Sequence, residues 1–435
     1  MNYELFVGIS ATVSVLVLLS MRVPIGIALA VPSILGIALV TEDLEAGARS
    51  ALVATFDAFN RESFVIIPLF VAMATLSTTT GMTAGVFEAL KRWVGRMRGG
   101  LGVATSLGSG MFAAVSGSSL ATVTMMSKVA LTEMERAGYH RQLATGIIAA
   151  SGTVGILIPP SIILVLYAIL SDTSVGAVLL AGIIPGILTV IANVVTVMVL
   201  ARRKPDWAPL VPLENRLTHV QAIAKCTPVL VIFLVVVGGL YAGIWTAAES
   251  AAAGVVTVVI IGLLRRKLDR KAMWNSLSEA VTMSVSIAFM LAGAFILTRL
   301  LSITGVTQAI AEGLTQIHGG RAVTLAIFIL TLLVLGTFLE GLTIMAIALP
   351  IMTPVIIELG YSPVWFAIII VKTIEIAVIS PPIGLNMYAI SATRPDIPVN
   401  IIFRGVVPFY VAELVIILLI IFIPDIALWL PSLQG

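Results

Sequence analysis

Residues 155–169 read GILIPPSIILVLYAI, an apolar run that two consecutive prolines interrupt in its middle. A second apolar run, AVISPPIGLNMYAI at residues 377–390, carries another such pair. A proline lacks the amide donor of a helix and disfavours helical backbone at the residue before it. Each pair therefore predicts a helix broken near its centre, with carbonyl groups freed near 155–158 and 377–380. A proline kink that serves only helix packing is the simpler alternative for either pair taken alone.

The rest of the chain is as apolar as these two runs. Of its 435 residues 59% are hydrophobic and 11% charged, and the mean hydropathy is +1.12. Soluble domains contain about 45–50% apolar and about 25% charged residues. The composition excludes a soluble enzyme, a disordered chain and a nucleic-acid binder, and it predicts an all-α polytopic membrane protein. One cysteine and three histidines indicate no disulfide, cofactor or transition-metal centre.

Ten membrane spans of about 20 residues each are predicted. They lie near 4–20, 23–40, 64–80, 142–170, 177–200, 224–240, 246–264, 276–298, 364–392 and 405–423. Two further apolar segments, 100–126 and 321–356, are broken by small and polar residues. The flanking charges do not alternate across either segment. We therefore interpret both as re-entrant helical hairpins that return to the side they came from.

The basic residues orient these spans. With the N-terminus outside, all but five of the 25 Lys and Arg residues lie on the cytoplasmic side, as the positive-inside rule requires. The C-terminus is then also outside, and the localisation expected is a bacterial inner membrane. Two basic segments, 88–98 and 128–141, flank the first hairpin and are predicted as amphipathic arms at the cytoplasmic interface.

The two halves of the chain resemble each other. VSGSSLAT at 115–122 precedes the first proline pair, and LEGLTIMA at 339–346 precedes the second. Gly117 and Pro159 are 42 residues apart, and Gly341 and Pro381 are 40 apart. Five spans per half invert the second copy relative to the first. Inverted repeats with discontinuous helices are the plan of many secondary transporters. A channel is a weaker alternative, and enzyme motifs such as HExxH, GxSxG and the nucleotide-binding glycine loop are absent from the sequence.

Hydroxyl groups and glycines gather at the first hairpin tip, where they could bind a cation or serve only helix packing. Asn386 follows the second break; it could contact a substrate or a cation, or cap freed backbone. Lys372 and Glu375 lie three residues apart on one helix face and are expected to pair. We expect structural roles for Glu249 and Glu413 within apolar runs.

Taken together, SGSSLAT, GILIPPS, FLEGLTIMAIALPIM and ISPPIGLNMY resemble the large membrane (M) subunit of TRAP transporters, the tripartite ATP-independent periplasmic carriers. The resemblance covers nearly the whole chain. It implies a sodium-driven, elevator-type secondary transporter that takes organic carboxylates from a periplasmic binding protein. It also implies a small four-span membrane subunit (Q), here a separate polypeptide. A standalone sodium–dicarboxylate symporter of the same architecture is the alternative.

The resemblance also implies where the ligands bind. Sodium ions are expected where each hairpin tip meets its broken helix. The first site would use Ser116, Ser118, Gly155, Ile158 and Pro160, and the second Gly341, Thr343, Ser380 and Pro382. Substrate contacts are expected from Ser119, Thr122, Thr153 and Asn386. Na⁺ is the only ion expected.

An elevator needs a fixed scaffold and a moving transport domain. We expect residues 1–80 and 201–300 to supply the scaffold helices of the two repeats. Residues 81–200 would hold the arm helices, first hairpin and first broken helix. Residues 301–435 would hold the second arm, hairpin and broken helix and the last span.

Overall fold

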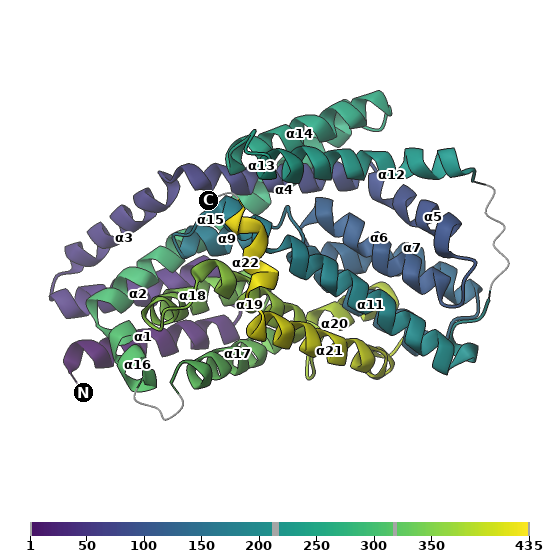
Figure 1. Ribbon diagram of the computed structural model, residues 1–435. Coiled ribbons are helices and arrows are strands. Elements are labelled where there is room, and N and C mark those ends of the chain that lie inside the picture. Colours follow the sequence, from purple (N-terminus) through teal and green to yellow (C-terminus); the bar gives the residue numbers. More distant parts are fainter. Residues whose placement is uncertain (1, 211–216, 316–319, 434–435) are drawn as a thin grey trace.

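The chain folds into a bundle of helices that run mostly along one axis, horizontal in Figure 1. The computed structural model describes residues 2–210, 217–315 and 320–433. Every regular element in these ranges is a helix, and nine of the helical segments described are long and apolar enough to cross a membrane. The predicted class, an all-α polytopic membrane protein, is confirmed.

The first half comprises eleven α-helices and two 3₁₀ turns. They are α1 (Tyr3–Ser20), α2 (Ile25–Thr41), α3 (Leu44–Phe59), η1 (Glu62–Val65), α4 (Ile66–Thr79), α5 (Met82–Val94), α6 (Gly100–Ser116), α7 (Ser119–Arg136), α8 (Arg141–Thr153), η2 (Val154–Ile156), α9 (Ile162–Leu170), α10 (Val175–Ala181) and α11 (Ile183–Arg203).

The second half follows a similar order: spans, then a hairpin, then a broken helix. Its elements are η3 (Pro205–Trp207), α12 (His219–Phe233), η4 (Leu234–Gly238), α13 (Gly239–Tyr241), α14 (Ala247–Leu264), α15 (Arg270–Ile303), α16 (Val306–Thr315), α17 (Gly320–Phe338), α18 (Gly341–Glu358), α19 (Pro363–Ala377), α20 (Leu385–Thr393), α21 (Val399–Phe422) and α22 (Asp425–Ser432).

Three segments differ from the sequence prediction. The second basic arm, 128–141, is mostly the continuation of hairpin helix α7, because no glycine or proline interrupts residues 119–136. Between the predicted spans 23–40 and 64–80, where no helix was predicted, lies helix α3, which the Asp43 carboxylate caps by accepting from the Glu45 amide at 2.9 Å. Helix α15 has 34 residues, against 23 in the predicted span, and is therefore about 51 Å long.

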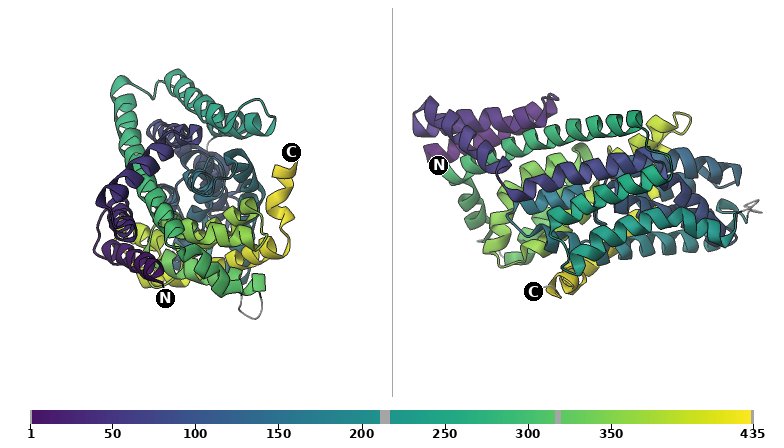
Figure 2. Two further views of the ribbon diagram at one scale, coloured as in Figure 1. Left: turned by 90° about the vertical axis from the view of Figure 1, so that its left-hand side faces the viewer. Right: turned by 90° about the horizontal axis from the view of Figure 1, so that it is seen from above.

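Helix α15 packs against α2, α3 and α4. Seen end-on, α1–α3 lie on the side opposite α22, and α14 lies at the top together with the upper end of α15 (Figure 2). The α2–α15 crossing is close because glycines lie in it: a Cβ at Gly293 would lie 2.8 Å from the Gly26 carbonyl oxygen. Small residues allow such backbone approach between membrane helices.

Helices of the second half also pack directly on helices of the first. Helix α21 crosses α8 at Gly146, where a Cβ would lie 2.1 Å from the Gly405 carbonyl oxygen. Helix α20 packs on α7, and α18 packs on α9. The two hairpins and the two broken helices therefore form one contiguous packing unit.

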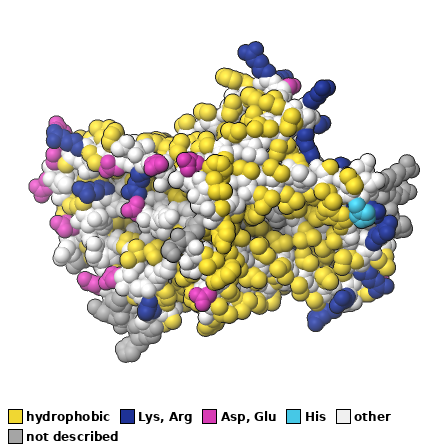
Figure 3. Space-filling model, turned by 45° about the horizontal axis from the view of Figure 1, so that its top comes forward, with side chains coloured by type: hydrophobic (Ala, Val, Ile, Leu, Met, Phe, Trp, Pro, Cys, Tyr) yellow, Lys and Arg dark blue, Asp and Glu magenta, His cyan; other side chains and the backbone are white. Residues whose placement is uncertain are grey.

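An ion-pair network joins this unit at one end of the molecule. Arg394, just after α20, donates to Glu135 of α7 at 2.7 Å and to both carboxylate oxygens of Asp396 at 2.8 Å. These hydrogen bonds from Arg394 hold the pKa of the exposed Asp396 below its usual range. Lys and Arg side chains gather towards this end, on the right of Figure 3, and most of the Asp and Glu visible there lie towards the other end.

At the opposite end, one arginine links the α15 group of helices to the first broken helix. Arg61 precedes η1 and donates to Asp172 Oδ1 at 2.9 Å and to the Ile169 carbonyl at 3.3 Å. Its guanidinium also lies 5.0 Å from the centre of the Phe295 ring of α15. The Arg61 side chain is 37% exposed and that of Asp172 88% exposed. The α15 group of helices and the first broken helix are therefore joined by packing in the core of the bundle and also by this contact at the surface.

Candidate functional site

The first hairpin turns at a glycine between two serines. Gly117 has φ +60°, a left-handed conformation that costs a residue with a Cβ about 1–2 kcal/mol. Ser118 caps α7 by accepting from the Ala121 amide at 3.4 Å. Thr122 donates from Oγ1 to the Ser118 carbonyl at 2.7 Å, and the Ser116 hydroxyl lies 3.4 Å from Thr122 Oγ1. Hydroxyl oxygens of the tip therefore cluster within one turn of helix.

The tip lies directly against the first helix break. A Cβ at Gly117 would lie 2.8 Å from the Pro160 carbonyl oxygen. A Cβ at Gly155 would lie 3.1 Å from the Ser118 carbonyl oxygen and 3.2 Å from Thr122 Oγ1. Only glycine fits at either position without displacing the opposing backbone. The structure thus brings together residues that the sequence separates by about forty positions.

The proline pair leaves one carbonyl of the first break without its usual helical donor. Residues 159 and 160 have no amide hydrogen, so the Gly155 and Ile156 carbonyls lose their i+4 partners. The Ser161 hydroxyl donates to the Ile156 carbonyl in compensation. The Gly155 carbonyl, next to the Ser118 tip, is therefore available for a ligand. Ile158 turns its side chain towards Gly186 of α11.

The second break satisfies more of its own backbone. The Val378 carbonyl accepts from the Asn386 amide at 3.2 Å, and the Ala377 carbonyl accepts from the Ser380 amide at 3.0 Å. Ser380 Oγ donates to the Ile376 carbonyl at 2.5 Å. Gly384, with φ +61°, returns the chain into α20. This break therefore offers fewer free carbonyls than the first.

The second hairpin tip packs between the two broken helices. A Cβ at Gly341 would lie 2.9 Å from the Ile163 side chain of α9 and 3.1 Å from the Ile374 side chain of α19. Thr343, two residues further, is 4% exposed. The surroundings of Gly341 are apolar, in contrast to the hydroxyl-rich first tip.

Asn386 connects the second break to the first hairpin. Its Oδ1 accepts from the Ser119 hydroxyl at 2.9 Å, and its Nδ2 donates to the Ala149 carbonyl of α8 at 3.2 Å. Asn386 is 1% exposed and Ser119 7% exposed. The three roles considered for Asn386 are contact with a substrate, contact with a cation, and capping of freed backbone. The observed bonds form a bridge between elements of both halves.

A cavity of about 90 Å³ lies where these elements meet. Both tips, both helix breaks and α15 line it. The lining residues are Gly117, Ser118, Ser119, Leu120, Ile156, Ile162, Ile163, Met283, Ile287, Glu340, Gly341, Leu342, Val378, Leu385 and Asn386. Glu340 is the one charged side chain among them. The cavity is therefore the place where a small ligand would contact both hairpins and α15 at once.

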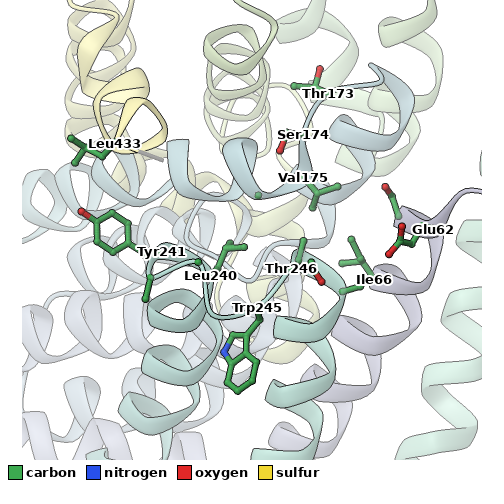
Figure 4. A pocket seen from close by; sticks show the side chains of 16 residues that line it. Glu62, Ile66, Thr173, Ser174, Val175, Leu240, Tyr241, Trp245, Thr246 and Leu433 are labelled. Carbon is green, nitrogen blue, oxygen red and sulfur yellow. The ribbon is translucent and has the colours of Figure 1, made fainter. Parts of the chain in front are cut away.

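A larger open hollow, of about 730 Å³, lies elsewhere (Figure 4). It is formed by the ends of α4, α10, α13 and α14 with Leu433 near the C-terminus, and neither hairpin tip contributes to it. Glu62 is its one charged lining residue. Its Trp245 indole donates to the Val235 carbonyl at 3.2 Å. We therefore place the functional site at the tips.

The structure gathers part of each predicted ligand set. Ser119 and Asn386 line the cavity, whereas Thr122 and Thr153 are fully buried and donate to carbonyls of their own helical segments at 2.7 and 2.8 Å. Gly341 lines the cavity, and Pro382 is exposed. Each predicted sodium and substrate contact stays a prediction.

Eleven of the fifteen residues that line the cavity were not among the predicted ligands, and Glu340, Met283 and Ile287 stand out among these eleven. Glu340 precedes the tip glycine Gly341, so a carboxylate within an apolar hairpin was the available signal. Met283 and Ile287 belong to α15, and nothing in their sequence separates them from other apolar residues of a span. Only the packing of α15 against α18 identifies them.

Replacing Asn386 by leucine should lower transport without unfolding the chain. The substitution leaves the Ser119 hydroxyl without its buried acceptor, which costs about 1–3 kcal/mol, and it also removes the Nδ2 bond to the Ala149 carbonyl. We expect at least a tenfold loss of uptake by reconstituted protein at unchanged expression. Ser119→Ala is the matched control: it removes the donor to Oδ1, leaves the Nδ2 bond to Ala149, and should cost less. Equal uptake by Asn386→Leu and the unmodified chain would contradict the bridging role.

Two hairpins whose tips meet two interrupted helices, within a bundle of apolar spans, define a membrane transport permease. Comparison with known proteins agrees. The family model "Tripartite ATP-independent periplasmic transporter, DctM component" matches residues 12–426. The chain belongs to this family, and is thus a TRAP transporter large membrane subunit, as the resemblance predicted.

Individual proteins show how far the similarity extends. The C4-dicarboxylate TRAP transporter large permease protein DctM of Pseudomonas aeruginosa is 32% identical over 388 residues, covering 89% of this chain and 90% of its own. The sialic acid TRAP transporter large permease protein SiaM of Vibrio cholerae is 30% identical, covering 85% and 86%. A solved structure, the YdaH transporter of Alcanivorax borkumensis, shares the fold with a TM-score of 0.62 at 13% identity, covering 85% of this chain and 87% of that one.

Proposed function

We propose that this subunit imports an organic carboxylate by sodium-driven, elevator-type alternating access. The observation that carries the proposal is the contact of the first hairpin tip with the first helix break. There, Gly117 meets the Pro160 carbonyl, and the Ser118 backbone meets Gly155. Hydroxyl and carbonyl oxygens are the hard ligands that small cations prefer. The Gly155 carbonyl, deprived of its helical donor by the proline pair, suits a sodium ion.

The charge of the cavity supports coupling between cation and substrate. Glu340 is the one acidic residue that lines the cavity, and none of the lining residues is basic. A carboxylate substrate would add a second negative charge in a poorly solvated space. Sodium ions at the tips would offset both charges, and the N-termini of the half-helices would add positive dipole ends. Binding of the anion would then require the cations.

The packing supports a division into two bodies. Helices α6–α11 and α17–α21 are joined by the Ser119–Asn386–Ala149 bridge and by the Glu135–Arg394 pair. Helices α1, α2, α4, α14 and α15 pack on one another. We propose the first group as the transport body and the second as the scaffold. The resident membrane would be the bacterial inner membrane, with both termini outside.

The family name and the named relatives support the partners. The family is tripartite by name, and the two relatives described above are named for C4-dicarboxylate and for sialic acid. We propose that this chain works with a separate four-span Q subunit and with a periplasmic protein that delivers the substrate.

Uptake by proteoliposomes tests the proposal. The vesicles hold this chain and its Q subunit, and radiolabelled carboxylate is offered with or without binding protein and with sodium or choline outside. We expect uptake only with both sodium and binding protein. Uptake with sodium alone would favour the standalone symporter. Uptake indifferent to choline replacement would overturn the sodium coupling.

A further inference from the structure

A cluster of buried charges lies apart from the hairpin tips, between α11, α19 and α21. Lys372 and Glu375 of α19 are both 0% exposed, and Glu413 of α21 is 1% exposed. Lys372 Nζ donates to Glu375 Oε2 at 2.8 Å and contacts Glu413 Oε2 as well. The expected pairing of Lys372 with Glu375 is therefore present, with a second carboxyl on the same ammonium group.

All three N–H donors of the Lys372 ammonium group have partners. Its third donor goes to Thr189 Oγ1 of α11 at 2.7 Å, and the Thr189 hydroxyl in turn donates to the Pro185 carbonyl at 2.9 Å. An ammonium has three donors. One lysine thus faces two carboxyls, and it has no donor left for their remaining oxygens.

Several polar atoms of this cluster have no hydrogen-bond partner within the described part of the chain. They are Glu375 Oε1, Glu413 Oε1 and both amide atoms of Asn193. Asn193 is 1% exposed and follows Thr189 by four residues, so it lies on the same face of α11. Helix α11 packs against α21, which carries Glu413. An unpartnered amide and two unpartnered carboxyl oxygens therefore face one buried region.

The packed helices carry few other charged groups, mostly near their ends. On the helices packed against α19 and α21 these are Arg141, Arg202, Arg203, Arg321, Glu358, Arg404 and Asp425. The Tyr167 hydroxyl of α9 donates its hydrogen bond to the Pro363 carbonyl at 2.7 Å. None of these groups forms an ion pair or hydrogen bond with Lys372, Glu375 or Glu413 in the described part of the chain, so the cluster must balance its own charge.

We propose that this cluster is a proton-binding site, holding one proton shared by the Glu375 and Glu413 carboxyls. With both carboxyls ionised it would carry a net negative charge in an apolar interior, which is strongly unfavourable. One bound proton makes the cluster neutral and supplies a donor for an unpartnered oxygen. A proton needs only one acceptor and no coordination cage. The proton belongs to the pair rather than to either residue.

The position gives the proton a connection to the proposed transport body. Glu375 lies five residues before Ser380, within the helix that leads into the second break. Glu413 belongs to α21, which packs on α8 and α20. The site is distinct from the tip cavity, and its existence does not depend on sodium coupling.

Infrared spectroscopy of the reconstituted full-length protein tests this site. At neutral pH in sodium-free buffer we expect a carbonyl stretching band of a protonated carboxylic acid, which shifts in deuterated water. Glu375→Gln or Glu413→Gln should remove one carboxyl's intensity from that band. Glu340→Gln, which alters the membrane carboxyl of the tip cavity, should leave this component unchanged, as should the exposed Glu279→Gln.

Three results would overturn the proposal. One is the absence of any protonated-carboxyl band in the unmodified protein, which can be read even if a variant fails to fold. The second is a band that disappears only in Glu340→Gln. The third is a band that sodium chloride removes while potassium chloride does not, because the cluster would then bind a metal cation. Failure of sodium-coupled uptake would leave the infrared result unaffected.

Discussion

Gly117→Ala should lower the apparent sodium affinity of uptake by about 30- to 100-fold. The residue has φ +60°, so any Cβ costs about 1–2 kcal/mol in backbone strain. The new Cβ would also lie 2.8 Å from the Pro160 carbonyl oxygen and push the tip off the break. We assign about 2–3 kcal/mol to the strain and the collision together, and each 1.4 kcal/mol lowers the affinity by a factor of ten. The measurement is the sodium concentration that gives half-maximal uptake in proteoliposomes.

Gly81→Ala provides the matched control. Gly81 has φ +64°, nearly the same backbone conformation, but no atom lies within 4 Å of its would-be Cβ. It therefore carries the strain without the collision, and it lies before α5, away from the cavity. We expect its sodium dependence to stay close to that of the unmodified chain. Identical sodium dependence of both variants would show that the Gly117–Pro160 contact does not form the cation site.

Lys372→Met should destabilise the protein by about 3–5 kcal/mol. The substitution preserves most of the side-chain volume but leaves Glu375 and Glu413 without their shared cation in a fully buried site. Removing one partner of a buried charge cluster costs this much because the remaining charge stays desolvated. The measurement is denaturant unfolding of the detergent-solubilised protein, followed by its tryptophan fluorescence.

The triple variant Lys372→Met, Glu375→Gln, Glu413→Gln separates charge from packing. It removes all three ionisable groups and keeps similar shapes, and replacing a whole buried ion cluster by neutral groups is often close to neutral in stability. We expect it to recover most of the loss. Thr189→Val, which removes one hydrogen bond to Lys372 and keeps both carboxyl contacts, should cost about 1–3 kcal/mol. If the triple variant were as unstable as Lys372→Met, packing rather than charge would be responsible.

The sequence predicted the parts of the fold that depend on local chemistry. The proline pairs at 159–160 and 381–382 predicted both breaks, because a missing amide acts on its own helix. Long apolar runs predicted seven of the nine described segments long enough to cross a membrane, and the other two, α17 and α18, lie in the predicted second hairpin. The α3 helix and the full length of α15 were missed. Both contain polar residues, and a search for long apolar runs does not detect helix in such segments. The end of the first hairpin was misplaced because a basic face can belong to an arm or to a long hairpin helix.

The site was predictable where a motif repeats and was not where packing alone assembles it. Gly117 and the serines beside it at 116–119 indicated the first tip. The bond from Ser119 to Asn386 joins residues 267 positions apart, and no local pattern marks such a pair. The same holds for Met283 and Ile287, which become cavity residues only because α15 crosses the hairpins. Contacts between distant elements need the folded chain.

The Arg61 contact has a consequence for the rate of transport rather than for the affinity of ligand binding. Arg61 lies on the scaffold side, and its partners Asp172 and Ile169 lie on the first broken helix. If the transport body slides as proposed, this link opens and closes once per turnover. An exposed ion pair is worth about 0–1 kcal/mol, and salt screens it over a Debye length of about 10 Å at 0.1 M. Breaking the pair would then add a small amount to the barrier for movement of the transport body. The size of this addition would depend on the ionic strength outside the cell.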